Sequence, residues 1–134
     1  MADLFSDAWM TSYKDEWNKE PDLSGKLKEI NFSSNIAYGF LDEDKPRGIL
    51  VIENGLATEA RPYKDGDEQN WDLRASKENW DKWIEKGLGM ASLGAAYVSG
   101  KLKFKTGDYK AMIKDPRMAG PFVKSFTVMG RISG

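Results

Sequence analysis

The Asn54-Gly55 dipeptide is the feature that most constrains the fold of this 134-residue chain. Asn-Gly is typical of a two-residue turn with positive φ at both positions, and such turns join antiparallel strands. The runs ILVIE and LATEARPY flank the dipeptide and read as strands. Upstream, Ile36, Tyr38 and Phe40 alternate along the segment SNIAYGFL, which a charged turn separates from ILVIE. These three segments predict an antiparallel meander.

The N-terminal segment predicts a helix over residues 3–19. Aromatic residues recur at every fourth position from Phe5 to Trp17, which places them on one helix face. Pro21 ends this helix. Such a stripe is usually core, because aromatic burial dominates packing energy.

The second half of the chain predicts two more strands and further helices. The run WDLRA is the fourth strand, and Ser76 can cap the following helix, which turns Trp80 and Trp83 to one side. A short helix over about residues 90–98 follows a pair of glycines. Lysine and apolar residues then alternate from 101 to 105 as a fifth strand, and helices complete the chain.

The expected fold class is therefore α+β, with a five-stranded, mostly antiparallel sheet whose one face is covered by helices. A chain of this length supports one core. We expect a single domain over residues 1–134, with the N-terminal helix at 3–19 and the sheet and its helices at 32–132.

The composition excludes several kinds of site. The chain has no histidine and no cysteine, which removes the commonest general base, the commonest metal ligand and any disulfide. A 40% hydrophobic and 31% charged composition is typical of a soluble globular protein. No run has the length of a signal peptide or membrane span, so we expect a cytoplasmic protein.

Two motifs suggest ligands but fail on spacing. An EF-hand loop begun at Asp65 would carry Asn70 where glycine is needed and Ser76 where a bidentate glutamate is needed. A dinucleotide fingerprint begun at Gly87 would carry Ser92 where its third glycine is needed, and it would follow a helix. We therefore expect no metal site and no cofactor. No pair of carboxylates, lysines or tyrosines gathers in an apolar setting, so catalysis has no positive support.

Charge is distributed unevenly along the chain. Residues 1–100 carry 12 Lys and Arg against 19 Asp and Glu, a charge of −7, whereas residues 101–134 carry 8 against 2, a charge of +6. Lys101, Lys103 and Lys105 share one face of the fifth strand, and Phe104 points to the other, which argues against base stacking and a nucleic-acid partner. These lysines are candidates for docking an anionic membrane or partner; the alternative, that they only solvate the sheet, stays open.

The runs WDLRASKENWDKWIEKG, residues 71–87, and AAYVSGKLKFKTGDYKAMIK, residues 95–114, resemble the sterol carrier protein type two domain. The likeness is specific over about residues 71–114 and topological over 32–63. The resemblance implies a sheet and helices around an apolar tunnel that takes fatty acids, acyl-coenzyme A, phospholipids or sterols, and it implies no catalysis by the domain.

The resemblance also implies that apolar side chains of the helices and the fifth strand line the tunnel. The candidate ligand-binding residues are Trp80, Trp83, Ile84, Met90, Leu93, Tyr97, Phe104, Met112, Ile113, Phe122, Phe126 and Met129. The expected function is non-catalytic lipid transport by a monomer or homodimer. An interaction or dimerisation module that assists an enzyme is the alternative, and an enzyme that uses carboxylates is a weaker third.

Three departures from the family pattern bear on these expectations. The run GLGMASLG replaces a Lys-x-Asn-Pro type turn, which alters the mouth of the tunnel. The final RISG lacks a peroxisomal Ser-Lys-Leu address. Trp80 and Trp83 either fill volume that family members leave open or offer flat walls to a ring-shaped ligand.

Overall fold

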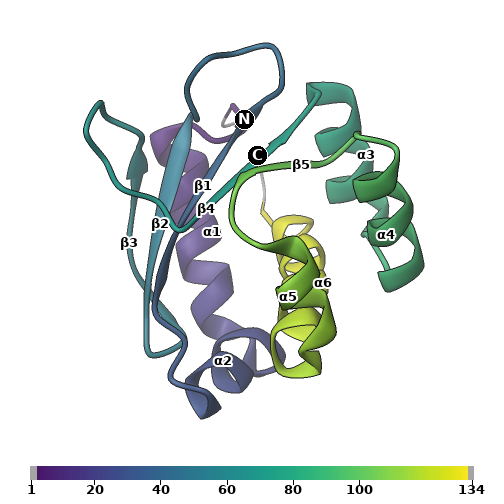
Figure 1. The fold of residues 1–134 in the computed structure, drawn as a ribbon. Helices are drawn as coiled ribbons and strands as arrows, with labels where there is room; N and C mark the ends of the chain where they lie inside the picture. The colour runs from purple at the N-terminus through teal and green to yellow at the C-terminus, as the bar shows by residue number, and fades with distance from the viewer. Residues whose placement is uncertain (1–2, 133–134) are drawn as a thin grey trace.

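A computed structural model of the chain describes residues 3–132. One five-stranded sheet packs against helices, which confirms the α+β class (Figure 1). The strands are β1 (Ser34–Phe40), β2 (Gly48–Glu53), β3 (Leu56–Pro62), β4 (Trp71–Ala75) and β5 (Lys103–Thr106). The helices are α1 (Asp7–Lys19), α2 (Lys26–Glu29), α3 (Lys77–Lys86), α4 (Met90–Val98), α5 (Tyr109–Lys114) and α6 (Pro116–Met129), with a π-helical turn, η1 (Pro21–Gly25), after α1.

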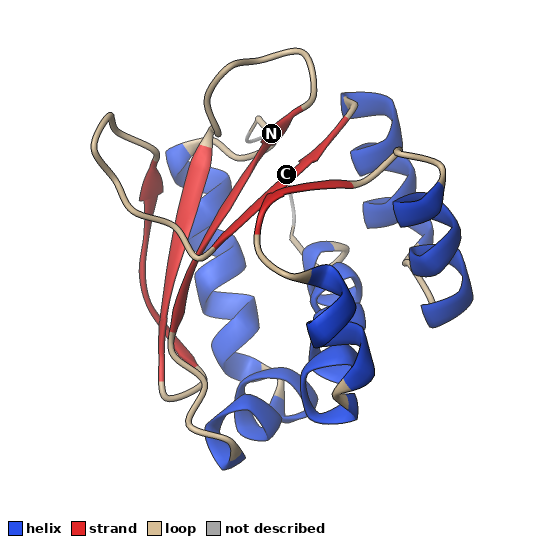
Figure 2. Ribbon diagram, viewed as in Figure 1, coloured by secondary structure: helices blue, strands red, loops and turns tan. Residues whose placement is uncertain are grey.

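The sheet has the strand order β3-β2-β1-β4-β5 (Figure 2). The β1–β2, β2–β3 and β4–β5 pairs are antiparallel, as expected of a mostly antiparallel sheet, whereas β1 and β4 pair in parallel. The meander is confirmed, and Asn54 and Gly55 adopt φ of 50° and 84° at its second turn. These positive angles are those of the two-residue hairpin turn that the dipeptide predicts.

The first helix begins at Asp7, so the prediction of a helix from residue 3 is wrong at its start. Phe5 has φ of 64°, which a right-handed helix excludes, and the Ser6 hydroxyl accepts a hydrogen bond from the Trp9 N–H as an N-cap. Phe5 is nevertheless buried edge-on against Trp9, with ring centroids 5.2 Å apart. The aromatic stripe therefore extends beyond the N-terminal end of α1.

Two other boundaries differ from the expectation. The fifth strand begins at Lys103, so Lys101 lies before it, because the pairing of β5 with β4 ends where Lys103 meets Arg74. Residues 21–29 form η1 and α2, which no periodic pattern predicted. The helices α3 and α4 have their expected bounds.

The two faces of the sheet differ in what covers them. Ile36 and Tyr38 of β1 face the helices, whereas Ala37 and Gly39, which alternate with them, face the other way. On that other face, Pro46 of the β1–β2 loop lies against Gly39. The Cβ alternation of a strand produces this division. Within residues 3–132, no helix is both long and apolar enough to cross a membrane.

Candidate functional site

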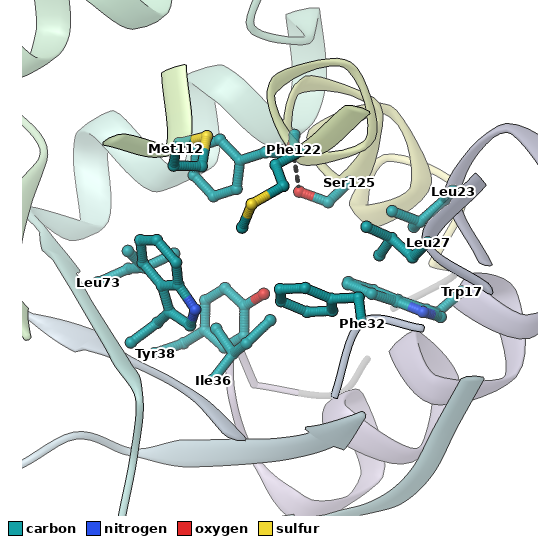
Figure 3. Close-up of a pocket in the computed structure, with 12 residues that line it drawn as sticks. Trp17, Leu23, Leu27, Phe32, Ile36, Tyr38, Leu73, Met112, Phe122 and Ser125 are labelled. Atoms are coloured by element: carbon teal, nitrogen blue, oxygen red, sulfur yellow. Dashed lines mark hydrogen bonds between the residues drawn. The ribbon is translucent and has the colours of Figure 1, made fainter. Parts of the chain in front are cut away.

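An apolar cavity lies between the helix-facing side of the sheet and the helices (Figure 3). The sheet provides Ile36, Tyr38, Trp71 and Leu73. The opposite walls come from α1, η1, α2, α5, α6 and the connection to β1, as Trp17, Leu23, Leu27, Phe32, Met112, Met118, Phe122 and Ser125. Every element that covers this part of the sheet therefore contributes to the wall.

The cavity is narrow, with a volume of about 40 Å³ accessible to a water-sized molecule. Ligand sites in proteins commonly have volumes of about 300–1,000 Å³ and largely apolar walls, so a lipid would enter this cavity only if the side chains of its wall moved apart. Among the described residues, the lining includes no carboxylate, lysine or arginine, so it offers burial to a ligand but no ion pair. Met112 and Met118 are flexible side chains that adapt to varied apolar shapes.

Two hydroxyl groups, those of Tyr38 and Ser125, belong to the cavity wall, and a third, that of Tyr13, contacts Tyr38 from outside the lining. The hydroxyl oxygens of Tyr13 and Tyr38 lie 3.0 Å apart, and both side chains are buried. The Ser125 hydroxyl donates to the Phe122 carbonyl. Burial raises the pKa of both tyrosine hydroxyls, and their hydrogen bond raises that of Tyr38 further. Both tyrosines therefore remain neutral hydrogen-bonding groups and are poor general bases.

An ion-pair cluster fastens two parts of the cavity wall together. The Glu20 carboxylate accepts a hydrogen bond from the Asp22 N–H at 3.0 Å and forms an ion pair with Arg131 at 2.7 Å. The backbone hydrogen bond and then Arg131 hold the pKa of Glu20 below its usual value. Because Glu20 caps η1 and Arg131 follows α6, this cluster holds η1 against α6, and both line the cavity.

Of the twelve residues that the sequence suggested for ligand binding, Met112 and Phe122 line the cavity. Trp80 lies in the core instead, where its indole N–H donates to the Gly39 carbonyl at 2.8 Å and its ring stacks on Phe126. The tryptophan fills volume there.

The other ten suggested residues lie outside the cavity lining. Leu93, Phe126 and Met129 are buried in the core. Trp83 lines a separate groove beside α4, and Met90 is 48% exposed. The remaining suggested residues are partly buried and pack against the core, and they are Ile84, Tyr97, Phe104 and Ile113.

Sequence reasoning missed the sheet side of the cavity and the wall from residues 17–32. The alternation of Ile36 with Tyr38, and of Trp71 with Leu73, already placed these side chains on one face of each strand. Since the expected tunnel lies between helices and sheet, that face could have been included. The contributions of Leu23 and Phe32 had no comparable signal, because no periodic pattern marks their segment.

The three lysines proposed for docking are exposed. Lys103 pairs with Arg74, whereas Phe104 pairs with the cavity residue Leu73. Lys103 therefore lies on the face of the sheet that is turned away from the cavity, whereas a register shift between Asp72 and Leu73 leaves Lys105 as an extra, unpaired residue of β5. Lys101 lies apart from them and lines the groove beside α4.

The fold resembles solved structures at low sequence identity. The crystal structure of sterol carrier protein 2 matches with a TM-score of 0.77 over 98% of this chain and 100% of that chain, at 18% identity. The chain has the sterol carrier protein 2 fold. This confirms the fold that the resemblance implied. No protein-family model matches the chain, and no curated protein matches its sequence.

Two further structures share the sterol carrier protein 2 fold with this chain. The apo form of sterol carrier protein 2 from Yarrowia lipolytica matches with a TM-score of 0.53 over 98% of both chains, at 13% identity. A ubiquinone synthesis protein, UbiJ-SCP2, matches with a TM-score of 0.58 over 93% of this chain and 90% of that chain, at 14% identity.

Proposed function

We propose that this protein binds a lipid or another apolar small molecule in the cavity between the sheet and α5 and α6, and carries it without chemical change. The observation that carries the proposal is the apolar cavity, lined from both sheet and helices, in a chain with the sterol carrier protein 2 fold. Fatty acids, acyl-coenzyme A, phospholipids and sterol-like molecules are the proposed ligands, and the cytoplasm is the proposed location.

The lining also supports a non-catalytic role. Tyr38 and Ser125 are its hydroxyl groups, and their hydrogen bonds are directed to Tyr13 and to the backbone. Neither hydroxyl has an adjacent carboxylate or ammonium group in the lining that would activate it as a nucleophile or base. Binding would then rest on the burial of apolar surface, at about 25 cal/mol per Å².

The test is the affinity of a series of saturated fatty acids of increasing chain length, measured by displacement of a fluorescent fatty acid. Each buried CH₂ contributes about 0.8 kcal/mol, so affinity should rise about fourfold per carbon until the cavity is full. Met112→Trp should abolish binding because it fills the cavity, whereas Met90→Trp, on the exposed side of α4, should not. Equal affinity of parent and Met112→Trp would contradict the proposal.

A second candidate function is an accessory module of an enzyme. The likeness to UbiJ-SCP2, a ubiquinone synthesis protein, favours it. Native mass spectrometry of protein purified from its host separates the two, because a carrier should retain an apolar ligand, whereas a module should arrive empty and bound to an enzyme or to a second copy.

A further inference from the structure

The helix α4 exposes apolar side chains along its outer side. Its nine residues, MASLGAAYV, include no charged side chain. Val98 is 86% exposed and Met90 is 48% exposed, and Ala91 and Ala95 are exposed between them. In Figure 1, α3 and α4 lie at one side of the molecule, beyond β5 and far from α2. This helix therefore presents an uncharged, partly apolar outer surface.

A groove with unpaired lysines runs beside this surface. Lys82 and Lys86 of α3, together with Lys101 after α4, line it over a floor that includes Trp83 and Val123. In the part of the chain that the structure describes, no carboxylate lines the groove. Within the described residues 3–132, none of these lysines forms an ion pair, whereas Lys77 on the same α3 pairs with a neighbouring aspartate. Three lysines thus line the groove beside the exposed apolar helix, while Glu78, Asp81 and Glu85 of α3 lie outside this lining.

We propose that α4, with Lys82, Lys86 and Lys101, is the surface by which this protein docks on an anionic lipid bilayer. Helices that lie in a bilayer interface bury apolar side chains below the headgroups and place lysines among them. The proposal rests on the proposed carrier function, since a carrier must load and unload at a membrane. It assigns the docking surface to α4 and keeps Lys101 from the earlier strand hypothesis, whereas Lys103 lies on the outer face of the sheet.

Aromatic packing connects this surface to the cavity wall. On the inner side of α4, Tyr97 stacks on Tyr109 of α5, with ring centroids 3.9 Å apart and an interplanar angle of 18°. Met112 of the same α5 lines the cavity. A bilayer bound at α4 would therefore lie one helix away from the ligand.

The test is sedimentation with vesicles of phosphatidylcholine that contain 30% phosphatidylserine, in low salt. Neutralising one lysine near an anionic surface weakens partition about fivefold, so Lys82→Gln, Lys86→Gln and Lys101→Gln together should weaken it on the order of 100-fold. The matched control changes Lys103, Lys105 and Lys110 to Gln, three exposed lysines on β5 and α5, and should retain most of the binding.

A second pair of variants tests the apolar part of the surface. Val98→Ser should weaken vesicle binding severalfold, whereas Leu56→Ser, at a residue 43% exposed on β3, should leave it unchanged. Equal loss in the two triple-lysine variants would overturn the proposal, and so would binding of parent protein to soluble polyglutamate with none to vesicles. Displacement of a fluorescent fatty acid, measured on the same proteins without vesicles, tests the carrier function separately. If the parent protein sediments with vesicles but binds no fatty acid, the result contradicts the carrier function and leaves the docking surface supported.

Discussion

The hydroxyl oxygens of Tyr13 on α1 and Tyr38 on β1 lie 3.0 Å apart. Both residues are almost completely buried, with at most 1% of their surface exposed to solvent. This hydrogen bond joins the first helix to the central part of the sheet directly beside the cavity. Its partners are 25 residues apart in the chain. A contact of this kind stabilises the cavity wall only while both hydroxyls are present and neutral.

We expect Tyr13→Phe and Tyr38→Phe each to destabilise the protein. Removing Tyr13 leaves the Tyr38 hydroxyl without its partner, and an unsatisfied buried hydroxyl costs about 1–3 kcal/mol. Removing Tyr38 likewise leaves the Tyr13 hydroxyl without this partner. Urea unfolding of both variants and of the double variant measures this, and strict additivity of the two losses would contradict the coupling.

The same pair predicts a loss of stability at high pH. The folded pKa of each tyrosine is raised by burial, so above pH 10 the unfolded chain loses protons that the folded protein keeps. Stability should be unaffected by these groups below about pH 10 and should fall above it by about 1.4 kcal/mol per pH unit for each tyrosine. Unfolding free energies from pH 8 to 11 should decline more steeply in the parent than in the Tyr13→Phe, Tyr38→Phe double variant; parallel curves would contradict the assignment.

Ligand binding should change the fluorescence of the cavity tryptophans. Trp17 and Trp71 line the cavity, whereas Trp80 and Trp83 do not. We expect a fatty acid to alter emission in a Trp83→Phe variant as in the parent, and to alter it much less in a Trp17→Phe, Trp71→Phe variant. Far-UV circular dichroism checks that each variant is folded. A response that disappears with Trp83 would move the ligand to the groove beside α4.

The buried ion pair of β4 should be sensitive to loss of its arginine. Arg74 donates to Asp72 at 2.6 Å, and its second nitrogen donates to the backbone carbonyls of Phe40 and Glu43. Arg74→Ala should cost about 3–5 kcal/mol, because it leaves a buried carboxylate unpaired. The Arg74→Ala, Asp72→Ala double variant should recover part of this loss in thermal unfolding. A double variant less stable than Arg74→Ala would show that the carboxylate has another partner.

The hairpin turn at Gly55 should reject a side chain for two separable reasons. Its φ is 84°, and an added Cβ would lie 2.3 Å from the Lys28 backbone nitrogen. Gly66 has a similar φ of 94° with open space around it, so Gly66→Ala isolates the backbone effect of about 1–2 kcal/mol. Gly55→Ala should lose about 1–3 kcal/mol more, the usual cost of overpacking. Equal losses in chemical unfolding would contradict a steric role for α2.

The sequence by itself determined most of the elements of this fold. Alternation along β1 and β2, the Asn54-Gly55 turn and the cap at Ser76 are local patterns, and local patterns define strands, turns and helix starts. The resemblance of residues 71–114 to a known family supplied the fold, which the structure confirmed. The expected position of a cavity between helices and sheet followed from it.

The tertiary structure alone decided which of these side chains meet. The parallel pairing of β1 with β4, the contact of Tyr13 with Tyr38 and the wall from Leu23 to Phe32 all join segments whose local patterns do not specify a neighbour. Apolar periodicity marks a face for burial, but it does not distinguish the lining of a cavity from solid core. Trp80 and Met112 share that apolar character, and only the packing around each makes the first a part of the core and the second a wall of the cavity.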